Sequence, residues 1–125
     1  VLYGNIKRQQ ETTLGTEIKI MIIYVDIDET ICITNSDRDY TSSKPIQKNI
    51  DIVNALHSKG HRIVYWASRG TGTGADWFHL TINQLTEWEC KYHELRMGKP
   101  LYDLFIDDKN INAKDIEKLK SYLND

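Results

Sequence analysis

Short apolar runs alternate along the chain with segments that carry a helical stripe. One apolar run at 20–25 leads directly into acidic residues, and a second lies at 61–67. Between them, apolar residues recur at spacings of four and three over 46–56, which places them on one face of a helix. Pro45 suits the first turn of that helix and Gly60 the position just past its end. A buried strand, a helix and a second buried strand in this order predict a parallel α/β unit.

The rest of the chain continues this alternation. The pattern predicts a helix at 76–89, a short third strand at 91–95, a fourth strand at 101–106 and a last helix at 113–123. We expect a Rossmann-like parallel sheet with strand order 4-1-2-3, flanked by helices and without a cap domain. Residues 1–20 show no such period, and we interpret them as an N-terminal extension, a linker or an added edge strand. The predicted domain is therefore 21–125.

Composition narrows the class of protein without identifying it. The chain has 125 residues, 40% of them hydrophobic and 27% charged, which is ordinary for one globular domain. A net charge of −2 gives no basic surface for nucleic acid or an anionic membrane. No apolar run is long enough to span a bilayer and no signal peptide is visible, so we expect a cytoplasmic protein. Cys32 and Cys90 lack zinc-site spacing and are interpreted as reduced structural thiols.

Polar residues that could take part in catalysis or ligand binding follow three of the predicted strands. Asp26 and Asp28 end the first strand, Ser68 follows the second, and Asp107 and Asp108 end the fourth. In open α/β sheets, ligands bind at the carboxyl ends of the strands. The order 4-1-2-3 would bring Asp107 beside Asp26. Close carboxylates repel unless a cation or a proton joins them, and hard oxygen ligands suit Mg²⁺. A strand ending in a polar turn is the plainer alternative for the first pair alone.

These residues resemble the four motifs of the haloacid dehalogenase (HAD) superfamily. Residues 26–30 (DIDET) are similar to its D-x-D-x-T motif. Ser68, Lys99 within Gly-Lys-Pro, and the Asp-Asp pair at 107–108 are similar to its second, third and fourth motifs, in order. The resemblance covers 21–115. Within the superfamily, the small size and these motifs most resemble the small phosphatases linked to bacterial capsule polysaccharide biosynthesis.

The resemblance implies a role for each residue. Asp26 would be the nucleophile that forms an aspartyl-phosphate, and Asp28 the general acid that later acts as base. Mg²⁺ would be held by Asp26, the backbone carbonyl of Asp28 and Asp107. The Ser68 hydroxyl and the Lys99 ammonium would bind the remaining phosphoryl oxygens.

Several neighbouring residues would have supporting roles. Thr30 would fix the turn after the first strand, and Asp108 would hold a metal-bound water or orient Lys99. Arg69 leaves two interpretations open: contact with substrate, or a structural ion pair. The glycine-rich loop at 70–74 lacks the Gly-Lys-Ser/Thr ending of a P-loop, so we interpret it as a flexible loop at the mouth of the site. The histidines show no ligand spacing, and the tryptophans are expected mostly in the core.

The function predicted from the resemblance is Mg²⁺-dependent hydrolysis of a phosphomonoester. The gaps between the motifs leave no room for a cap domain, so the site should be open. It would then take a bulky substrate such as a sugar or polyol phosphate, or be covered by a second subunit. Two alternatives remain at this point: a phosphatase acting on nucleic-acid ends, which the acidic balance disfavours, and a receiver-like module that accepts phosphate on an aspartate. A non-catalytic binding domain is a third, disfavoured by the complete motif set.

Overall fold

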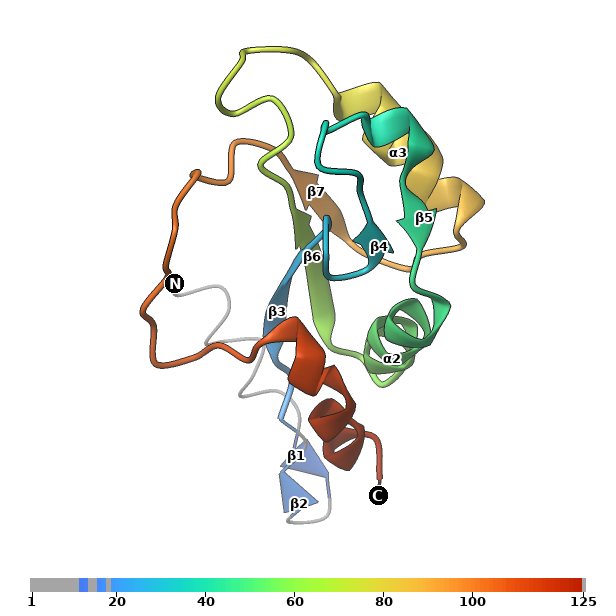
Figure 1. The fold of residues 1–125 in the computed structure, drawn as a ribbon. Coiled ribbons are helices and arrows are strands. Elements are labelled where there is room, and N and C mark those ends of the chain that lie inside the picture. The colour runs from blue at the N-terminus through green and yellow to red at the C-terminus, as the bar shows by residue number, and fades with distance from the viewer. Residues whose placement is uncertain (1–11, 14–15, 18, 125) are drawn as a thin grey trace.

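A three-stranded parallel sheet organises the molecule (Figure 1). The structure is a computed structural model that describes residues 12–13, 16–17 and 19–124. Strands β3 (Ile22–Asp26), β6 (Arg62–Trp66) and β7 (Glu94–Arg96) lie in that order. The first three predicted strands are therefore confirmed in their spatial order, although β7 begins three residues later than predicted. The fold is a small α/β fold consistent with a Rossmann-like architecture.

Helices connect the strands in the predicted sequence. Helix α2 (Gln47–Ser58) joins β3 to β6, and α3 (Phe78–Glu87) joins β6 to β7. A 3₁₀ helix, η2 (Ala113–Tyr122), takes the place of the predicted last helix, and the side chain of Asn112 caps it by accepting from the Lys114 amide. The loop after β3 carries a short antiparallel pair, β4 (Cys32–Ile33) and β5 (Lys44–Pro45), and one 3₁₀ turn, η1 (Tyr40–Ser42).

The local chemistry of α2 explains where it ends and which face it buries. Ile50, Val53 and Leu56 are buried, so the predicted stripe is the face that packs on the sheet. Gly60 has φ +101°, a left-handed conformation that glycine adopts at no steric cost. The helix begins at Gln47 and Pro45 belongs to β5, so the prediction that Pro45 lies in the first turn of the helix is wrong.

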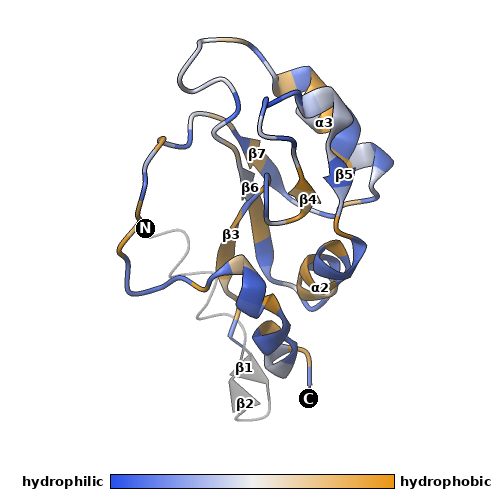
Figure 2. Cartoon of the chain, viewed as in Figure 1, coloured by the Kyte–Doolittle hydropathy of each residue, from blue (hydrophilic) through white to orange (hydrophobic). Residues whose placement is uncertain are grey.

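The hydrophobic core lies on one face of the sheet. The register places Ile23 beside Ile63 and Val25 beside Tyr65, and these side chains face α2, α3 and η2, which contribute to a single core cluster. The alternate residues of β3 point the other way, and two of them, Ile22 and Tyr24, are 38% and 46% exposed. Hydrophobic residues are concentrated on β3 and on the sheet-facing side of α2 (Figure 2).

The predicted fourth strand at 101–106 is wrong for the single chain. In the described residues the sheet has three strands, and β3 has a paired neighbour on one side only. Residues 100–112, which we call the arm, form no strand and are exposed throughout. The arm swings away to one side of the sheet and returns to η2 (Figure 1). The predicted strand order 4-1-2-3 is therefore corrected to 1-2-3, which corresponds to β3-β6-β7.

The predicted extension at 1–20 lies largely outside the described residues. Within it, β1 (Thr12–Thr13) and β2 (Thr16–Glu17) pair with each other. Ile20 is buried and lies near Gly60, so the packed domain begins at least one residue before Met21. None of the helices in the described part of the chain is both long and apolar enough to cross a membrane.

Candidate active site

A pocket of about 780 Å³ opens at the carboxyl ends of the parallel strands. It is lined by Asp26 from the end of β3, Asp28 from the turn that follows, Ser68 from the loop after β6 and Lys99 from the loop after β7. Parallel strands end at one edge of a sheet, which is why residues so distant in sequence meet there. Four of the residues singled out from the sequence are thus brought together.

Asp26 faces the pocket and keeps part of its carboxylate accessible. Its Oδ1 lies 3.7 Å from the Lys99 Nζ, and its Oδ2 accepts a 3.4 Å hydrogen bond from the Thr30 hydroxyl. Burial raises the pKa of Asp26 above its usual value, although the Lys99 charge opposes that rise. Thr30 therefore contributes to the turn after the strand, as predicted, and also contacts Asp26.

Backbone contacts place Lys99 at the pocket. Its amide donates to the Ala67 carbonyl at the end of β6, and its carbonyl accepts from the Thr71 hydroxyl at 2.9 Å. The ammonium donates to the Tyr102 hydroxyl at 2.8 Å and lies 4.7 Å from the centre of the same ring. The Lys99 charge is consequently held close to Asp26 by two neighbouring loops.

Asp28 is clamped by Arg69. The guanidinium donates two hydrogen bonds to the two carboxylate oxygens, Nε to Oδ2 at 3.0 Å and Nη2 to Oδ1 at 2.9 Å. Thr34 also donates to Oδ1. Burial raises the pKa of Asp28, but these hydrogen bonds and the Arg69 charge outweigh it and leave the pKa below its usual value. The carboxylate is accordingly held ionised, with both oxygens already accepting.

Arg69 is a structural residue in this arrangement. Its side chain is fully buried, and its remaining nitrogen, Nη1, donates to Thr81 at 3.1 Å and to Gln84 at 2.6 Å on α3. It also lies 4.7 Å above the Tyr40 ring. Of the two interpretations left open by the sequence, the ion pair is the one observed, and Arg69 does not line the pocket.

Ser68 and Gly70 bring the loop after β6 to the pocket. The Ser68 carbonyl accepts from the Thr71 amide at 3.0 Å, and Gly70 accepts from Gly74 at 2.8 Å, so the loop is internally hydrogen-bonded. Gly70 has φ +84°, and a methyl group there would lie 2.1 Å from the Ala75 oxygen. The glycine-rich loop is therefore at the mouth of the site, as predicted, with a fixed turn at its base.

The pocket also contains residues that the sequence did not single out. Tyr40 and Trp77 form one wall, with their ring centres 5.1 Å apart in an edge-to-face arrangement. Glu29 and Arg38 form a rim ion pair of 3.1 Å. Trp77 was expected in the core, as the tryptophans were in general. Its position directly after Asp76 in a polar loop was a local signal for exposure that an aromatic residue alone does not give.

The predicted magnesium ligands do not assemble within one chain. Asp107 and Asp108 lie on the exposed arm, where an oxygen of Asp107 accepts from the Lys109 amide. The described residues contain no group of three or more His, Cys, Asp or Glu side chains able to hold a metal ion. Because the fourth strand is absent, the placement of Asp107 beside Asp26 is wrong for the single chain, and no metal-dependent step can be derived from it.

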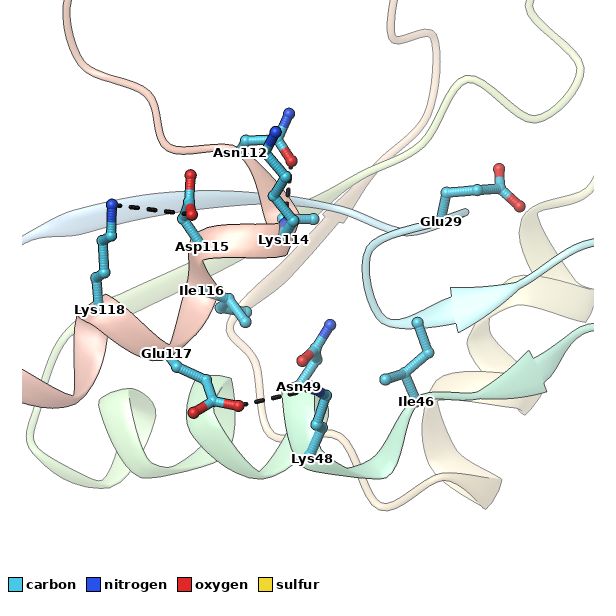
Figure 3. Close-up of a pocket in the computed structure, with 11 residues that line it drawn as sticks. Glu29, Ile46, Lys48, Asn49, Asn112, Lys114, Asp115, Ile116, Glu117 and Lys118 are labelled. Carbon is cyan, nitrogen blue, oxygen red and sulfur yellow. Dashed lines mark hydrogen bonds and ion pairs between the residues drawn. The ribbon is translucent and has the colours of Figure 1, made fainter.

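A second hollow of about 590 Å³ lies between η2 and the start of α2 (Figure 3). Glu29 is shared with the first pocket. Figure 3 shows ion pairs on its walls, Lys48 with Glu117 at 3.7 Å and Lys118 with Asp115 at 3.8 Å. Asn49 is buried there and donates to the Thr30 carbonyl at 2.8 Å. The acidic and basic side chains that line this hollow are equal in number, so their charges balance.

The histidines of the described region have structural surroundings. His61 accepts a hydrogen bond from the Met21 amide at 3.0 Å, and His93 accepts one from the Ile63 amide at 3.1 Å. His57 stacks on His93 with ring centres 4.6 Å apart. His79 is exposed, and its ring lies edge-to-face with Phe78.

Comparison with known proteins supports the fold alone. No family model matches the chain, and no curated protein matches it. Among solved structures, the chain is similar to the crystal structure of an MCSG target from Vibrio cholerae, with a TM-score of 0.72 and 21% sequence identity. The similarity covers 83% of this chain and 97% of that one. The two chains therefore share a small α/β fold over most of this chain and nearly the whole of the other.

Proposed function

We propose that the protein is a phosphatase that hydrolyses phosphomonoesters through an aspartyl-phosphate on Asp26, as its resemblance to the HAD superfamily implies. The observation that carries the proposal is the convergence of Asp26, Asp28, Ser68 and Lys99 on one pocket. A carboxylate, a hydroxyl and an ammonium from three separate loops are what phosphoryl transfer needs: a nucleophile and groups that stabilise charge on the transferred oxygens.

In the first step, an oxygen of Asp26 attacks phosphorus, the bond to the leaving oxygen breaks, and the leaving oxygen takes a proton from water. Lys99, 3.7 Å from Asp26, would offset negative charge on the phosphoryl group, and the Ser68 hydroxyl would donate to one of its oxygens. In the second step, water attacks the phosphorus of the aspartyl-phosphate, which releases inorganic phosphate and restores the Asp26 carboxylate.

Asp28 fits one half of its predicted acid–base role better than the other. An ionised carboxylate can take a proton from the attacking water, so the pairing with Arg69 favours the base role in the second step. To protonate the leaving group it would first have to carry a proton, which the same pairing opposes. Mg²⁺ dependence stays a prediction of the resemblance, as do the sugar or polyol substrate, the link to capsule biosynthesis and the cytoplasmic location.

The direct test is phosphate release from p-nitrophenyl phosphate with Mg²⁺ and again with excess chelator. We expect turnover by the wild type and a loss of roughly 10³-fold or more in Asp26→Asn, because the nucleophile is removed. Asp51→Asn is the matched control: it makes the same change on the exposed side of α2, where Asp51 accepts from Gln47, and should keep full activity.

Two outcomes would contradict the proposal: no turnover of any phosphomonoester by the wild type, or full turnover by Asp26→Asn. A phosphorylated protein that persists without releasing phosphate would instead favour the receiver-like alternative. Activity restricted to terminally phosphorylated oligonucleotides would favour the nucleic-acid end phosphatase.

A further inference from the structure

The arm exposes an unusual amount of apolar surface. Leu104 and Ile106 are 76% and 89% exposed, and Leu101, Tyr102 and Phe105 are each about half exposed or more. Contiguous exposed apolar surface on a small domain marks an interaction site. Figure 2 shows hydrophobic positions recurring along this part of the chain. A segment with this composition has the character of a strand that lacks a partner.

A complementary surface lies on the same molecule. Among the described residues, β3 is hydrogen-bonded to β6 but to no strand on its other side. Ile22 and Tyr24 on this edge strand are partly exposed. An unpaired edge with apolar side chains is a ready template for another strand. Within the residues that the structure describes, one copy of the chain therefore presents both an apolar segment without a strand partner and a sheet edge without one.

The geometry at the base of the arm prevents the arm from filling its own edge in the parallel direction. Lys99 and Leu101 are held at the carboxyl end of the sheet, Lys99 by the Ala67 carbonyl and Leu101 by contact with Gly72. A parallel strand beside β3 would have to begin at the opposite end of the sheet, near Met21. The chain cannot keep Lys99 at the pocket and start such a strand two residues later.

The reach of the arm leads to the same result. Asp107 follows Lys99 by eight positions, and eight extended residues span roughly 26 Å. If 101–106 is extended, Lys99 and Asp107 cannot serve the same pocket. They can serve two different pockets, one in each of two copies.

We propose that two copies of this chain exchange their arms, residues 101–106 of each adding a parallel strand to the β3 edge of the other. Such an exchange is self-complementary, so one twofold axis satisfies both edges. It would place Asp107 of the second copy beside Asp26 of the first. This last consequence rests on the proposed function, whereas the exchange itself does not.

The first experiment measures the oligomeric state by sedimentation velocity. We expect the wild type to be a dimer, and Ile106→Asp and Leu104→Asp to be monomers with unchanged circular dichroism, because both side chains are exposed in the single copy. Tyr122→Asp, which changes an exposed residue of η2, should remain dimeric. A monomeric wild type, or dimeric arm variants, would overturn the proposal.

The second experiment asks whether the pockets are composite. Asp26→Asn and Asp107→Asn chains are co-expressed with different tags and assayed on p-nitrophenyl phosphate. In an exchanged heterodimer one pocket carries both defects and the other none, so a random mixture should recover roughly a quarter of wild-type activity. If the Asp26→Asn and Asp107→Asn proteins are each inactive alone and remain inactive when co-expressed, the exchange is overturned. A wild type that turns over no substrate would contradict the proposed function, and the dimer would still be judged by the first experiment.

Discussion

At the scale of single residues, two carboxylates two positions apart have opposite surroundings. Asp26 has its pKa raised by burial, while Asp28 has its pKa lowered by Arg69 and Thr34 despite burial. Environments that separate two such pKa values assign different roles to chemically identical groups. Asp28 is fixed as an acceptor inside a buried network, and Asp26 is left with an accessible oxygen and a nearby cation. This difference makes Asp26 the better candidate for the reacting group.

The raised pKa of Asp26 predicts that removing its charge stabilises the fold at neutral pH. Ionising a carboxyl whose folded pKa lies above its unfolded value, near 3.8, costs stability as pH rises through the folded pKa. Asp26→Asn avoids this cost. Because the side chain is 37% exposed, solvent screening limits the expected gain to at most about 1 kcal/mol. Urea unfolding at pH 7 and below pH 3.8 measures it, and the gain should vanish at the lower pH.

A less stable Asp26→Asn at pH 7 would contradict this prediction. It would mean that the contacts with Lys99 and Thr30 outweigh the cost of burial. Asp51→Asn again serves as the control, since Asp51 is exposed and its change should leave stability within about 0.5 kcal/mol.

The Arg69 clamp predicts a large loss of stability when one partner is removed. Arg69→Met leaves a buried carboxylate unpaired, which typically costs about 3–5 kcal/mol. Arg69→Lys keeps the positive charge but loses the bidentate hydrogen bonding to Asp28, so we expect a smaller loss of stability. Guanidinium unfolding of both variants measures the difference.

The pH dependence provides the check on this assignment. The folded pKa of Asp28 is lowered, so its contribution to stability is present above its unfolded value, near 3.8, and is lost as pH falls through the folded value. The gap between wild type and Arg69→Met should therefore shrink in acid. A gap that is independent of pH, or an Arg69→Met variant as stable as wild type, would rule out the clamp.

Site residues could be predicted from sequence where strand ends determine their position. Asp26, Asp28 and Ser68 follow apolar runs, and parallel strands end on one side. Lys99 follows no such run and was predicted only from the resemblance. The role of Arg69 could not be predicted, because its partners Asp28 and Gln84 lie in other parts of the chain. The direction in which a long side chain points depends on tertiary contacts, which the local sequence does not specify.

At the scale of elements, the loop between β6 and α3 depends on one glycine more than on another. Gly70 and Gly74 both have positive φ, 84° and 78°. A methyl group at Gly70 would collide with the Ala75 oxygen, whereas at Gly74 nothing lies within 4 Å. Strain from the backbone alone should cost Gly74→Ala about 1 kcal/mol. Gly70→Ala should cost about 1–3 kcal/mol more, because the backbone must shift.

This pair can be measured by thermal unfolding and by turnover of p-nitrophenyl phosphate. Gly70→Ala should lower both stability and activity, since Ser68 sits in the same loop, while Gly74→Ala should lower stability slightly and leave activity near wild type. Equal effects of the two substitutions would show that the contact with Ala75 does not constrain the loop.

Elements were predictable where local pattern and tertiary packing agree. The stripe of α2 enters the core on the side that its periodicity marks, and the centre of β6 is buried as predicted. The run of β3 is buried only in part, because β3 lies at the edge of the sheet and leaves Ile22 and Tyr24 partly exposed. The run at 101–106 has the same apolar character and forms no strand in the single chain. A strand exists only with a hydrogen-bonded neighbour, and no local pattern says whether that neighbour lies in the same chain. Sequence reasoning therefore predicted a strand at 101–106 that the single chain does not form.

At the scale of the whole molecule, the main core cluster lies on the face of the sheet that carries Ile63 and Tyr65, although Val64 is also buried on the other face of β6. The two faces should differ most in their contribution to stability at the edge strand β3, where the residues of the other face are partly exposed. Ile63 is fully buried in the core cluster, so Ile63→Ala should cost about 2–5 kcal/mol, the usual loss for a core cavity. Ile22 points to the other face and is 38% exposed, so Ile22→Ala should cost under about 1.5 kcal/mol because less apolar surface leaves water on folding.

The two isoleucines are matched in chemistry and lie on neighbouring strands, which isolates the effect of the face. Both substitutions should be made in the Ile106→Asp background, so that association of two copies does not add to the stability of the open face. Urea unfolding then gives the free energies and the slopes with denaturant. Equal losses would contradict a one-sided core and would require a cover over Ile22 in the single copy. A difference that appears in Ile106→Asp and narrows in the wild type would place part of the stability of β3 in the contact between two copies.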